Sequence, residues 1–543
     1  AARMSIQGPF LAACLLLVAL PTEASDRSKH QSVILEADLH FLSLARSAHQ
    51  QQKVPVPVLV STELRSLHAF AAVATDCPSL KLMIPVMVAA IAVMCTLVWL
   101  RRQVRTSELV EQARLCILFP QFFCIVGSTI IVIDSAELAK KVDMAPGESG
   151  QLVGLNWLGS GIGFLAVWLA LRQDPMIWRK KSRTIFGSGV VVSILGCILF
   201  ICGAHAAEIG ASRVATSLTL KGARVLGGLG QGIVAQMMVV TIQSVTAKAD
   251  MAEQMTRVFT VNAVGVGSGP VLAACGHFLA ACPANTFSLV LAPAMQLVFF
   301  CGCLISVFAW FPDMSKVPLP DAPTVQSTTV VTVVAATSDI DEPSSIKRRQ
   351  ILIVSCISLF LLRGFVVSGV EVGSALLLER DFGIDRRLVG VAIGITIMVV
   401  LPVRVLYQRI NDSLTKVGWF RVFATLAFAG TSLLFQAASR AVPEGAALLL
   451  ADAIIFSSIT MADGISYGVL MVEVFPDGSF LDKNNTAALC NVLGMCFGRL
   501  SGPWLARYSL EALGSVGQNR YAFGQTLACA ATLFIFEVGV RPG

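Results

Sequence analysis

Two apolar stretches joined by a short polar break decide the fold of this chain. Residues 217–244 read SLTLKGARVLGGLGQGIVAQMMVVTIQS, and residues 258–276 read VFTVNAVGVGSGPVLAACG. Each is close to the ~20 residues that an α-helix needs to cross a membrane. An arginine inside such a helix costs about 2.5–3.5 kcal/mol on insertion scales, so Arg224 calls for a partner or a function. The two stretches therefore predict a transmembrane helical hairpin that carries a buried cation.

Small residues repeat at helical spacing in both stretches. Glycines four residues apart let two helix backbones approach closely. A proline removes one backbone hydrogen bond and bends a membrane helix, which neighbouring helices can tolerate. We therefore assign helix-packing or gating roles to the following residues: Gly228, Gly230, Gly232, Gly265, Gly269 and Pro270.

The composition indicates a polytopic membrane protein. The 543 residues are 55% hydrophobic and only 14% charged, whereas soluble globular proteins carry about 25% charged residues. The net charge of +7 comes from basic residues in short loops between apolar runs, a pattern that reflects membrane orientation. No basic tract with interleaved aromatic residues occurs, so we expect the lipid bilayer and no nucleic acid as a partner.

The N-terminal region precedes the main series of apolar runs. A short apolar core followed by small residues predicts a signal peptide over residues 1–25, with an N-terminal anchor as the alternative. Residues 26–81 are polar and mixed, and we expect them to lie outside the membrane. Residues 82–100 form an extra transmembrane helix, and the three arginines that follow it favour the cytoplasmic side.

Twelve further apolar runs divide into two sets of six. The runs lie roughly at 115–137, 151–171, 184–204, 217–240, 257–279, 286–311, 351–377, 388–407, 419–438, 446–470, 486–508 and 521–540. We therefore predict an N-terminal six-helix half over 115–311 and a C-terminal half over 351–540. The polar, proline-rich residues 312–350 between them are a cytoplasmic linker without a nucleotide-binding motif.

The two halves share internal similarity. Leu152-Val153-Gly154 opens the second run of the first half, and Leu388-Val389-Gly390 opens the second run of the other. Gly265-x-x-x-Gly269-Pro270 in the fifth run is echoed in the eleventh, at nearly the same offset, by Gly498, Gly502 and Pro503. Repeated halves with a site at their interface are a common transporter plan.

With these features the chain resembles the major facilitator superfamily over residues 115–540. Arg224 followed by spaced glycines resembles the family's fourth-helix motif. Gly265 to Pro270 resembles the fifth-helix motif of the drug/proton antiporter branch, although two alanines stand where that motif ends in glycines. Asp174, Arg179 and Lys180 fit the family's cytoplasmic gating loop loosely, because its leading glycine is missing. The resemblance implies two six-helix halves that work by alternating access.

Charged residues within the predicted spans are the candidates for substrate binding or proton coupling. Depth along each span, at ~1.5 Å per residue, places Arg224 where it could meet Asp134 at the outer end of the first run. Arg363 lies near the middle of the seventh run. The resemblance implies that the first, fourth, seventh and tenth spans line the cavity. The full set is Asp134, Arg224, Arg363, Glu371 and Asp463.

We therefore expect a secondary active transporter that moves a small solute, driven by a proton or solute gradient. Two cavity arginines leave open an organic-anion or phosphate-ester substrate. The extra N-terminal residues leave open a non-transporting sensor or scaffold. We expect no metal, no cofactor, a monomeric state, and a location in the plasma membrane or an endomembrane.

Enzymatic activity is not expected, although one motif calls for attention. Gly147-Glu148-Ser149-Gly150 matches the Gly-x-Ser-Gly of rhomboid-type proteases, whose serine needs a nearby histidine base. Here the motif directly precedes an apolar run, where glycine and serine are expected as a loop and a helix N-cap.

Overall fold

A computed structural model describes residues 78–145, 147–247, 250–279, 289–318, 343–439, 445–475 and 479–540. The predicted signal peptide and nearly all of the predicted extramembrane segment lie outside these residues, as do residues 319–342 of the predicted linker. Residues Ile84–Gly543 form one compact unit, which includes both of the predicted six-helix halves.

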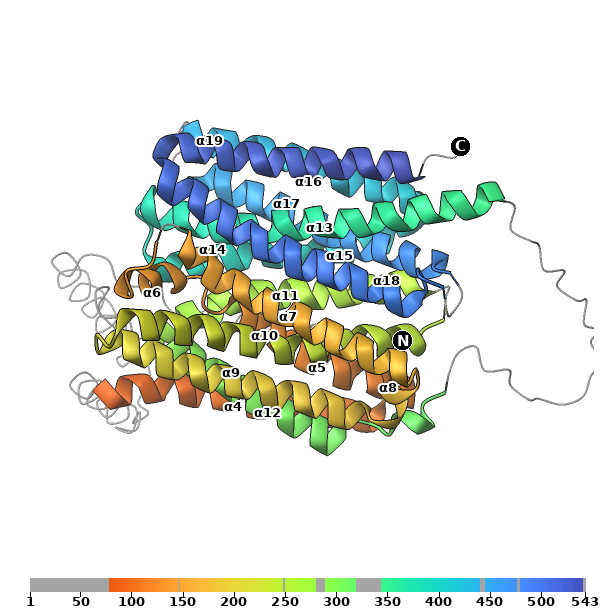
Figure 1. The fold of residues 1–543 in the computed structure, drawn as a ribbon, viewed down its shortest axis with the longest axis horizontal. Coiled ribbons are helices and arrows are strands. Elements are labelled where there is room, and N and C mark those ends of the chain that lie inside the picture. Colours follow the sequence, from red (N-terminus) through yellow and green to blue (C-terminus); the bar gives the residue numbers. More distant parts are fainter. Residues whose placement is uncertain are drawn as a thin grey trace, which may run out of the picture. The chain divides into compact units, whose positions relative to one another are not determined.

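The described residues are almost entirely helical (Figure 1). The first part of the chain forms α4 (Pro78–Thr106), α5 (Leu109–Thr129), α6 (Ser135–Lys141), α7 (Glu148–Gln173), α8 (Ile177–Lys180), α9 (Ser182–Glu208), α10 (Arg213–Ser244), α11 (Met251–Leu279) and α12 (Leu291–Trp310). The second part forms α13 (Pro343–Arg380), α14 (Arg386–Met398), α15 (Val400–Ile410), α16 (Lys416–Ser439), α17 (Ala446–Glu473), α18 (Lys483–Cys490), the π-helix η5 (Asn491–Gly498) and α19 (Arg499–Val540).

Twelve helices among the described residues are long and apolar enough to cross a membrane. The predicted run at 486–508 is not one of them, because it is divided between α18, the π-helix η5 and the first part of α19. The prediction of an all-α integral membrane protein is confirmed. We call the end of the bundle where α12 stops and α13 begins the linker end, and the opposite one the far end.

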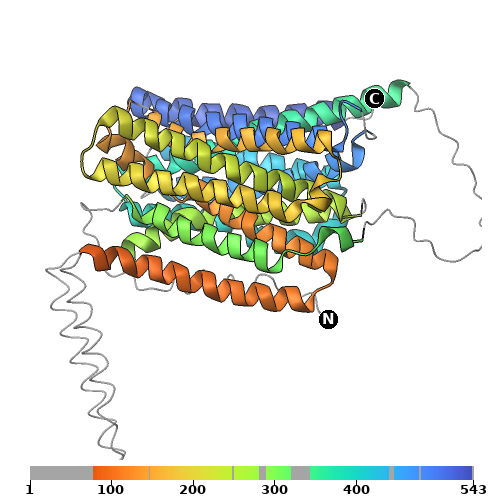
Figure 2. The same cartoon turned by 60° about the horizontal axis from the view of Figure 1, so that its bottom comes forward.

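The extra helix α4 lies beside α12 at the edge of the bundle (Figure 2). Its buried face includes Ala89, Val93 and Leu97, and a Cβ atom at Gly302 of α12 would overlap the side chain of Val93. The opposite face, with Ile91 and Val98, is exposed, as expected for a helix that borders lipid.

The contacts between the two halves include two matching pairs of helices, besides the packing of α11 on α17. In the first pair α7 packs on α19, and a Cβ atom at Gly150 would overlap the carbonyl of Pro503. In the second pair α14 packs on α11, and a Cβ atom at Gly390 would lie 2.7 Å from the carbonyl of Pro270. Each proline of the repeated motif therefore lies against a glycine of the other half.

The repeated glycines also pack the same pair of helices within each half. Gly269 of α11 lies against Thr129 at the end of α5, the first span of its half. Gly498 and Gly502 lie against Leu361 and Phe365 of α13, the first span of the other half. The sequence repeat thus corresponds to a repeat of helix contacts.

The glycines of α10 serve three close approaches. A Cβ atom at Gly228 would overlap the carbonyl of Asn156 on α7, and one at Gly232 would overlap the carbonyl of Ser160 one turn further along α7. Gly230 faces α9 instead, where it lies against Gly189. Larger residues at these positions would force α10 away from its neighbours.

Candidate functional site

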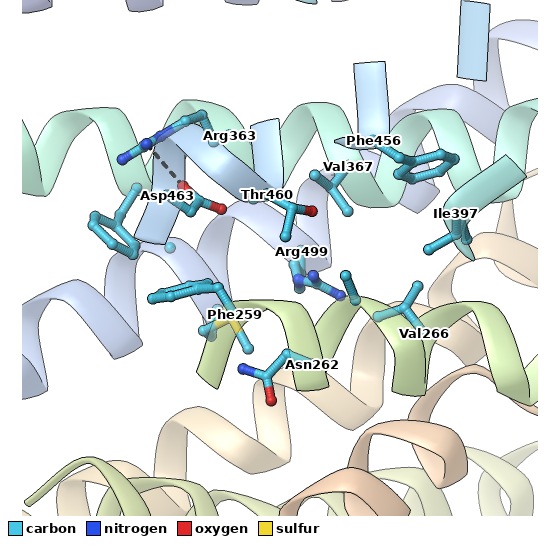
Figure 3. A pocket seen from close by; sticks show the side chains of 15 residues that line it. Phe259, Asn262, Val266, Arg363, Val367, Ile397, Phe456, Thr460, Asp463 and Arg499 are labelled. Carbon is cyan, nitrogen blue, oxygen red and sulfur yellow. Dashed lines mark ion pairs between the residues drawn. The ribbon is translucent and has the colours of Figure 1, made fainter. Parts of the chain in front are cut away.

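A small cavity lies where α11 of the first half meets α13, α14, α17 and the start of α19 (Figure 3). Its volume is about 40 Å³, and one water needs roughly 10–15 Å³ on this measure. The cavity therefore holds a few water molecules in this conformation and has no room for a sugar-sized solute. Phe259, Asn262 and Val266 form the wall contributed by the first half.

A buried ion pair forms the polar wall on the other side. Nη1 of Arg363 on α13 lies 2.9 Å from Oδ1 of Asp463 on α17, and it also donates to the Ser466 hydroxyl at 3.0 Å. The guanidinium lies near the faces of Phe360 and Phe420, at 4.8 and 5.6 Å from the ring centroids. The sequence indicated Arg363 and Asp463 as separate candidates, and in the structure the two side chains form an ion pair.

A second arginine reaches the cavity from the start of α19. The guanidinium of Arg499 lies 4.6 Å from the ring centroid of Trp157 on α7, so a cation of the second half contacts an aromatic ring of the first. Its Nη1 atom is buried and donates no hydrogen bond within the described part of the chain. The Arg499 guanidinium and the Trp157 ring belong to different halves. Their contact must therefore change when the halves move apart.

Glu371 lies outside the cavity lining, two turns beyond Arg363 on α13. Its side chain is buried, and its Oε1 atom has no hydrogen-bond partner among the described residues. Burial of a carboxylate without a hydrogen-bond partner is costly, which keeps Glu371 among the candidates for a functional role.

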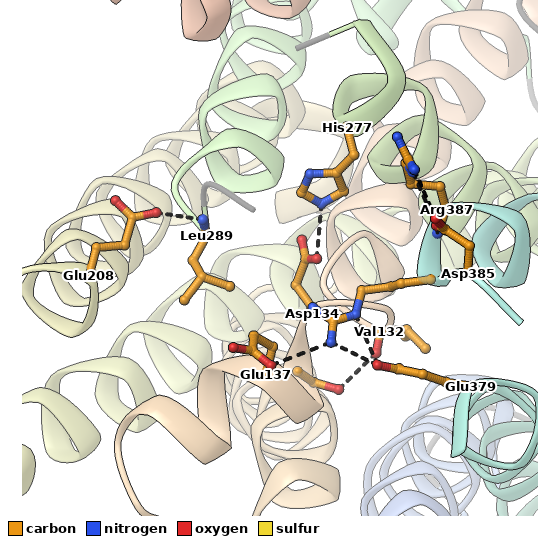
Figure 4. Close-up of polar contacts among 11 residues, drawn as sticks. Val132, Asp134, Glu137, Glu208, His277, Leu289, Glu379, Asp385 and Arg387 are labelled. Atoms are coloured by element: carbon orange, nitrogen blue, oxygen red, sulfur yellow. Dashed lines mark hydrogen bonds and ion pairs between the residues drawn. The ribbon is translucent and has the colours of Figure 1, made fainter. Parts of the chain in front are cut away.

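Charged residues hold the halves together at the far end (Figure 4). Nη2 of Arg386 on α14 lies 2.7 Å from Glu379 of α13 and 3.5 Å from Glu137 of α6, which belongs to the first half. Beside this network, Nε2 of His277 lies 2.9 Å from Oδ1 of the buried Asp134. The contact between Arg386 and Glu137 therefore links the two halves at this end.

Hydrogen bonds hold the halves together at the linker end. Gln243 of α10 donates to the Tyr467 hydroxyl of α17 at 3.2 Å, and its carbonyl accepts from Lys483 at 2.7 Å. The Trp168 indole of α7 donates to Asn485 of α18 at 2.7 Å. Contacts between the halves are therefore present at both ends of the bundle, on either side of the central cavity.

Comparisons with known proteins agree on the architecture. By sequence, the chain matches no protein-family model and no curated protein. By structure, it is similar to a D-xylose-proton symporter, with a TM-score of 0.53, 16% identity, and coverage of 79% of this chain and 97% of that one. It is also similar to the nucleoside transporter NupG, with a TM-score of 0.51, 12% identity, and coverage of 80% and 100%. The fold is that of the major facilitator transporters.

A third similar structure is the human organic anion transporter MFSD10, with a TM-score of 0.48, 15% identity, and coverage of 78% of this chain and 100% of that one. These neighbours are named as transporters and not as enzymes. The likeness to the D-xylose-proton symporter and to NupG, at 16% and 12% identity, shows the fold alone.

No carboxylate among the described residues pairs with Arg224, and Asp134 pairs with His277 instead, so the predicted meeting of Arg224 and Asp134 is not found. Its guanidinium donates to three backbone carbonyls, those of Gly127 at 3.2 Å, Ser128 at 2.7 Å and Leu152 at 3.0 Å. Two of these carbonyls lie in the last turn of α5, where a helix leaves its carbonyls without partners. A cation there is also favoured by the helix dipole. Arg224 therefore caps α5 inside the first half.

The predicted gating loop contacts the start of the linker. Lys180 lies 3.1 Å from the carboxylate of Asp174, and the hydrogen bond from Lys180 holds the pKa of Asp174 below its ordinary value. Arg179 donates to three backbone carbonyls within residues 314–317. These contacts tie the loop between α7 and α9 to the start of the linker, which follows α12.

The Gly-x-Ser-Gly motif marks a contact between the halves at the far end. Gly147 has a φ of +84°, which favours glycine, and its N–H donates to Glu511 of α19 at 2.6 Å. The Ser149 hydroxyl donates to the same carboxylate at 2.9 Å. No histidine contacts Ser149 in the described part of the chain, so the motif lacks the base that a serine protease requires.

Two functional candidates were missed from the sequence. Arg499 is not among the candidates selected from the sequence, yet it lines the cavity and contacts Trp157 across the interface. His277 is not among them either, but it forms a buried pair with Asp134. The described residues contain no group of three or more side chains with the arrangement of a metal site.

Proposed function

We propose that this chain is a secondary active transporter that moves a small solute by alternating access. The observation that carries the proposal is the small cavity between the two halves, with Arg363, Asp463 and Arg499 in its wall. Because the cavity holds only a few waters, the solute must enter a wider state in which one end has opened. The close glycine contacts of α7 with α19 and of α11 with α14 are the surfaces on which the halves would rotate.

The charges of the cavity favour a solute with an anionic group. Two arginines face one aspartate in the lining, and an arginine guanidinium binds carboxylate or phosphate groups in two-pronged geometry. Arg499 has a buried Nη1 atom without an acceptor in the described structure. We propose an organic anion or phosphate ester as the solute, bound between Arg499 and Arg363.

Asp463 is the proposed proton-coupling residue. In the structure its carboxylate neutralises Arg363 at 2.9 Å. A proton that adds to Asp463 removes this pairing and releases the Arg363 guanidinium for the anionic group of the solute. Proton and anion then bind together and cross in the same direction. The likeness of Gly265 to Pro270 to the antiporter motif predicts the opposite direction of proton flux, so the sign of the flux separates the two mechanisms.

The test uses purified protein in liposomes with a pH-sensitive dye inside. A panel of radiolabelled mono- and dicarboxylates, sugar phosphates, neutral sugars and organic cations is supplied with an imposed proton gradient. We expect uptake of an anionic member with acidification of the lumen. If no member of the panel moves, the non-transporting sensor replaces the transporter, and if an organic cation exchanges for protons, the antiporter does.

Asp463→Asn should separate coupling from binding. We expect the variant to keep exchange of labelled for unlabelled solute and to lose uptake driven by the proton gradient. Asp452→Asn is the matched control, because Asp452 is a buried carboxylate on the same helix that lies outside the cavity and accepts from Ser374 at 2.9 Å. Equal losses in the two variants would remove Asp463 from the coupling step.

A further inference from the structure

A second, larger cavity lies inside the C-terminal half at the linker end. Its volume is about 460 Å³, and it is enclosed by α13, α16, α17 and α19. A cavity of this size falls in the range of small-molecule sites, about 300–1,000 Å³. It is distinct from the cavity between the halves, and the proposed transport cycle does not use it.

The mouth of this cavity is basic. Three cations, Arg348, Arg349 and Lys416, surround it with one acid, Glu473. Arg349 is engaged with the end of α17, where it donates to the carbonyl of Glu473 at 2.5 Å and to that of Val474 at 2.9 Å. Arg348 and Lys416 are exposed, and neither forms an ion pair or hydrogen bond with any described residue. Among the described residues, these two cations at the mouth therefore form no ion pair.

The depth of the cavity is apolar. Leu352, Val469 and the ring of Phe420 line it, and Phe420 stacks on Phe536 with ring centroids 3.7 Å apart. A dissolved inorganic anion would use the two cations at the mouth and leave this apolar wall in contact with water. A ligand that satisfies both parts combines an anionic head with an apolar body.

The position of the mouth matches the surface of a bilayer. The membrane-spanning part of α13, Ile346–Arg380, is 35 residues long, whereas ~20 residues cross the hydrocarbon core. Figure 1 shows α13 extending past its neighbours at the linker end. Arg348 is two residues from the start of this span, and Lys416 is the first residue of α16. Both cations thus lie where lipid headgroups lie, on the side that the basic loops predict to be cytoplasmic.

We propose that this cavity binds an anionic phospholipid, with its phosphate between Arg348 and Lys416 and the glycerol and upper acyl chain against the apolar wall. Basic pockets between transmembrane helices at the cytoplasmic surface suit such headgroups. The floor of the cavity links it to the transport site, because Ser466 and Phe420 line it and both contact Arg363. A bound lipid therefore contacts Ser466 and Phe420, two of the side chains that position the Arg363–Asp463 ion pair.

The experiment measures binding of dioctanoyl phosphatidic acid to the purified full chain by native mass spectrometry, with dioctanoyl phosphatidylcholine and inorganic phosphate as comparison ligands. Each cation near a membrane surface contributes about 1 kcal/mol, so the double variant R348Q/K416Q should bind phosphatidic acid about 30-fold more weakly. The matched control R101Q/R102Q removes two exposed arginines from the end of α4 and should bind as the unmodified protein does.

A second variant tests the apolar depth independently of charge. Val469→Trp fills the cavity and should abolish phosphatidic acid binding while both cations remain. The proposal is overturned if R348Q/K416Q and R101Q/R102Q weaken binding equally, or if Val469→Trp leaves binding unchanged. It is also overturned if inorganic phosphate displaces phosphatidic acid at a concentration close to the dissociation constant of phosphate for the two cations. The cavity would then be a site for a soluble anion. These measurements involve no transport, so they stand apart from the transporter proposal.

Discussion

Replacing Arg224 with alanine tests whether this residue stabilises the first half or takes part in transport. The variant leaves the buried carbonyls of Gly127, Ser128 and Leu152 without the donors seen at 2.7–3.2 Å. Each unsatisfied buried group costs about 1–3 kcal/mol, and removal of the buried cation returns part of that cost. We therefore expect a loss of about 3 kcal/mol in the free energy of unfolding of the first half.

A change of 1 kcal/mol shifts the Tm of a unit of about 200 residues by about 2–4 °C, so Arg224→Ala should lower the apparent Tm by about 6–12 °C. The assay is thermal unfolding of detergent-purified protein, followed by size-exclusion chromatography of the heated sample. Gly222→Ala is the control on the same helix, because a Cβ atom there has nothing within 4 Å, and its Tm should not fall. Transport by Arg224→Ala, measured well below its Tm, should persist. An unchanged Tm together with lost transport would refute the capping role and return Arg224 to the transport mechanism.

Two further predictions concern the helix contacts and the far end. Gly228→Ala places a methyl group against the Asn156 carbonyl, and overpacking of this kind lowers the free energy of unfolding by about 1–3 kcal/mol. Thermal unfolding should show a lower Tm for this variant, whereas the Tm of the Gly222→Ala control should not change. Arg386→Gln removes the cation between Glu137 and Glu379, so an impermeant thiol reagent applied from the far side should react faster with the thiol introduced by Ile397→Cys. Arg380→Gln, whose guanidinium pairs with Asp381 and donates to the Leu510 carbonyl within the second half, should leave that labelling rate unchanged, and equal acceleration by both variants would contradict the role of Arg386.

The architecture could be predicted from the sequence because it depends on composition and spacing. Apolar runs of the right length give membrane helices whatever their partners are. The repeated Gly-x-x-x-Gly-Pro motif indicated both the duplication and the helices that pack closely, and the structure places Pro270 and Pro503 at the same point of two matching interfaces. Close packing leaves a trace in sequence because only glycine fits where a backbone carbonyl lies in the way of a Cβ atom.

Charge pairing could not be predicted in the same way. Depth along a helix says how far a charge is buried, but not which way its side chain points around the helix. Arg224 and Asp134 lie at similar predicted depths, yet Arg224 binds carbonyls of α5 and Asp134 binds His277. Backbone carbonyls as partners are also invisible in a sequence, since every residue carries one.

The π-helix η5 gives the cavity a feature that depends on helical register. A π-turn holds one more residue than an α-turn, and η5 ends at Gly498, directly before Arg499. Successive residues of an α-helix are about 100° apart around its axis. If η5 changed from π-helical to α-helical geometry, the part of the helix after it would rotate about the helix axis relative to the part before it. The rotation would equal about one residue, or about 100°. Arg499 would then swing off the ring of Trp157 and out of the cavity, so a local change in winding could set the charge that a solute meets.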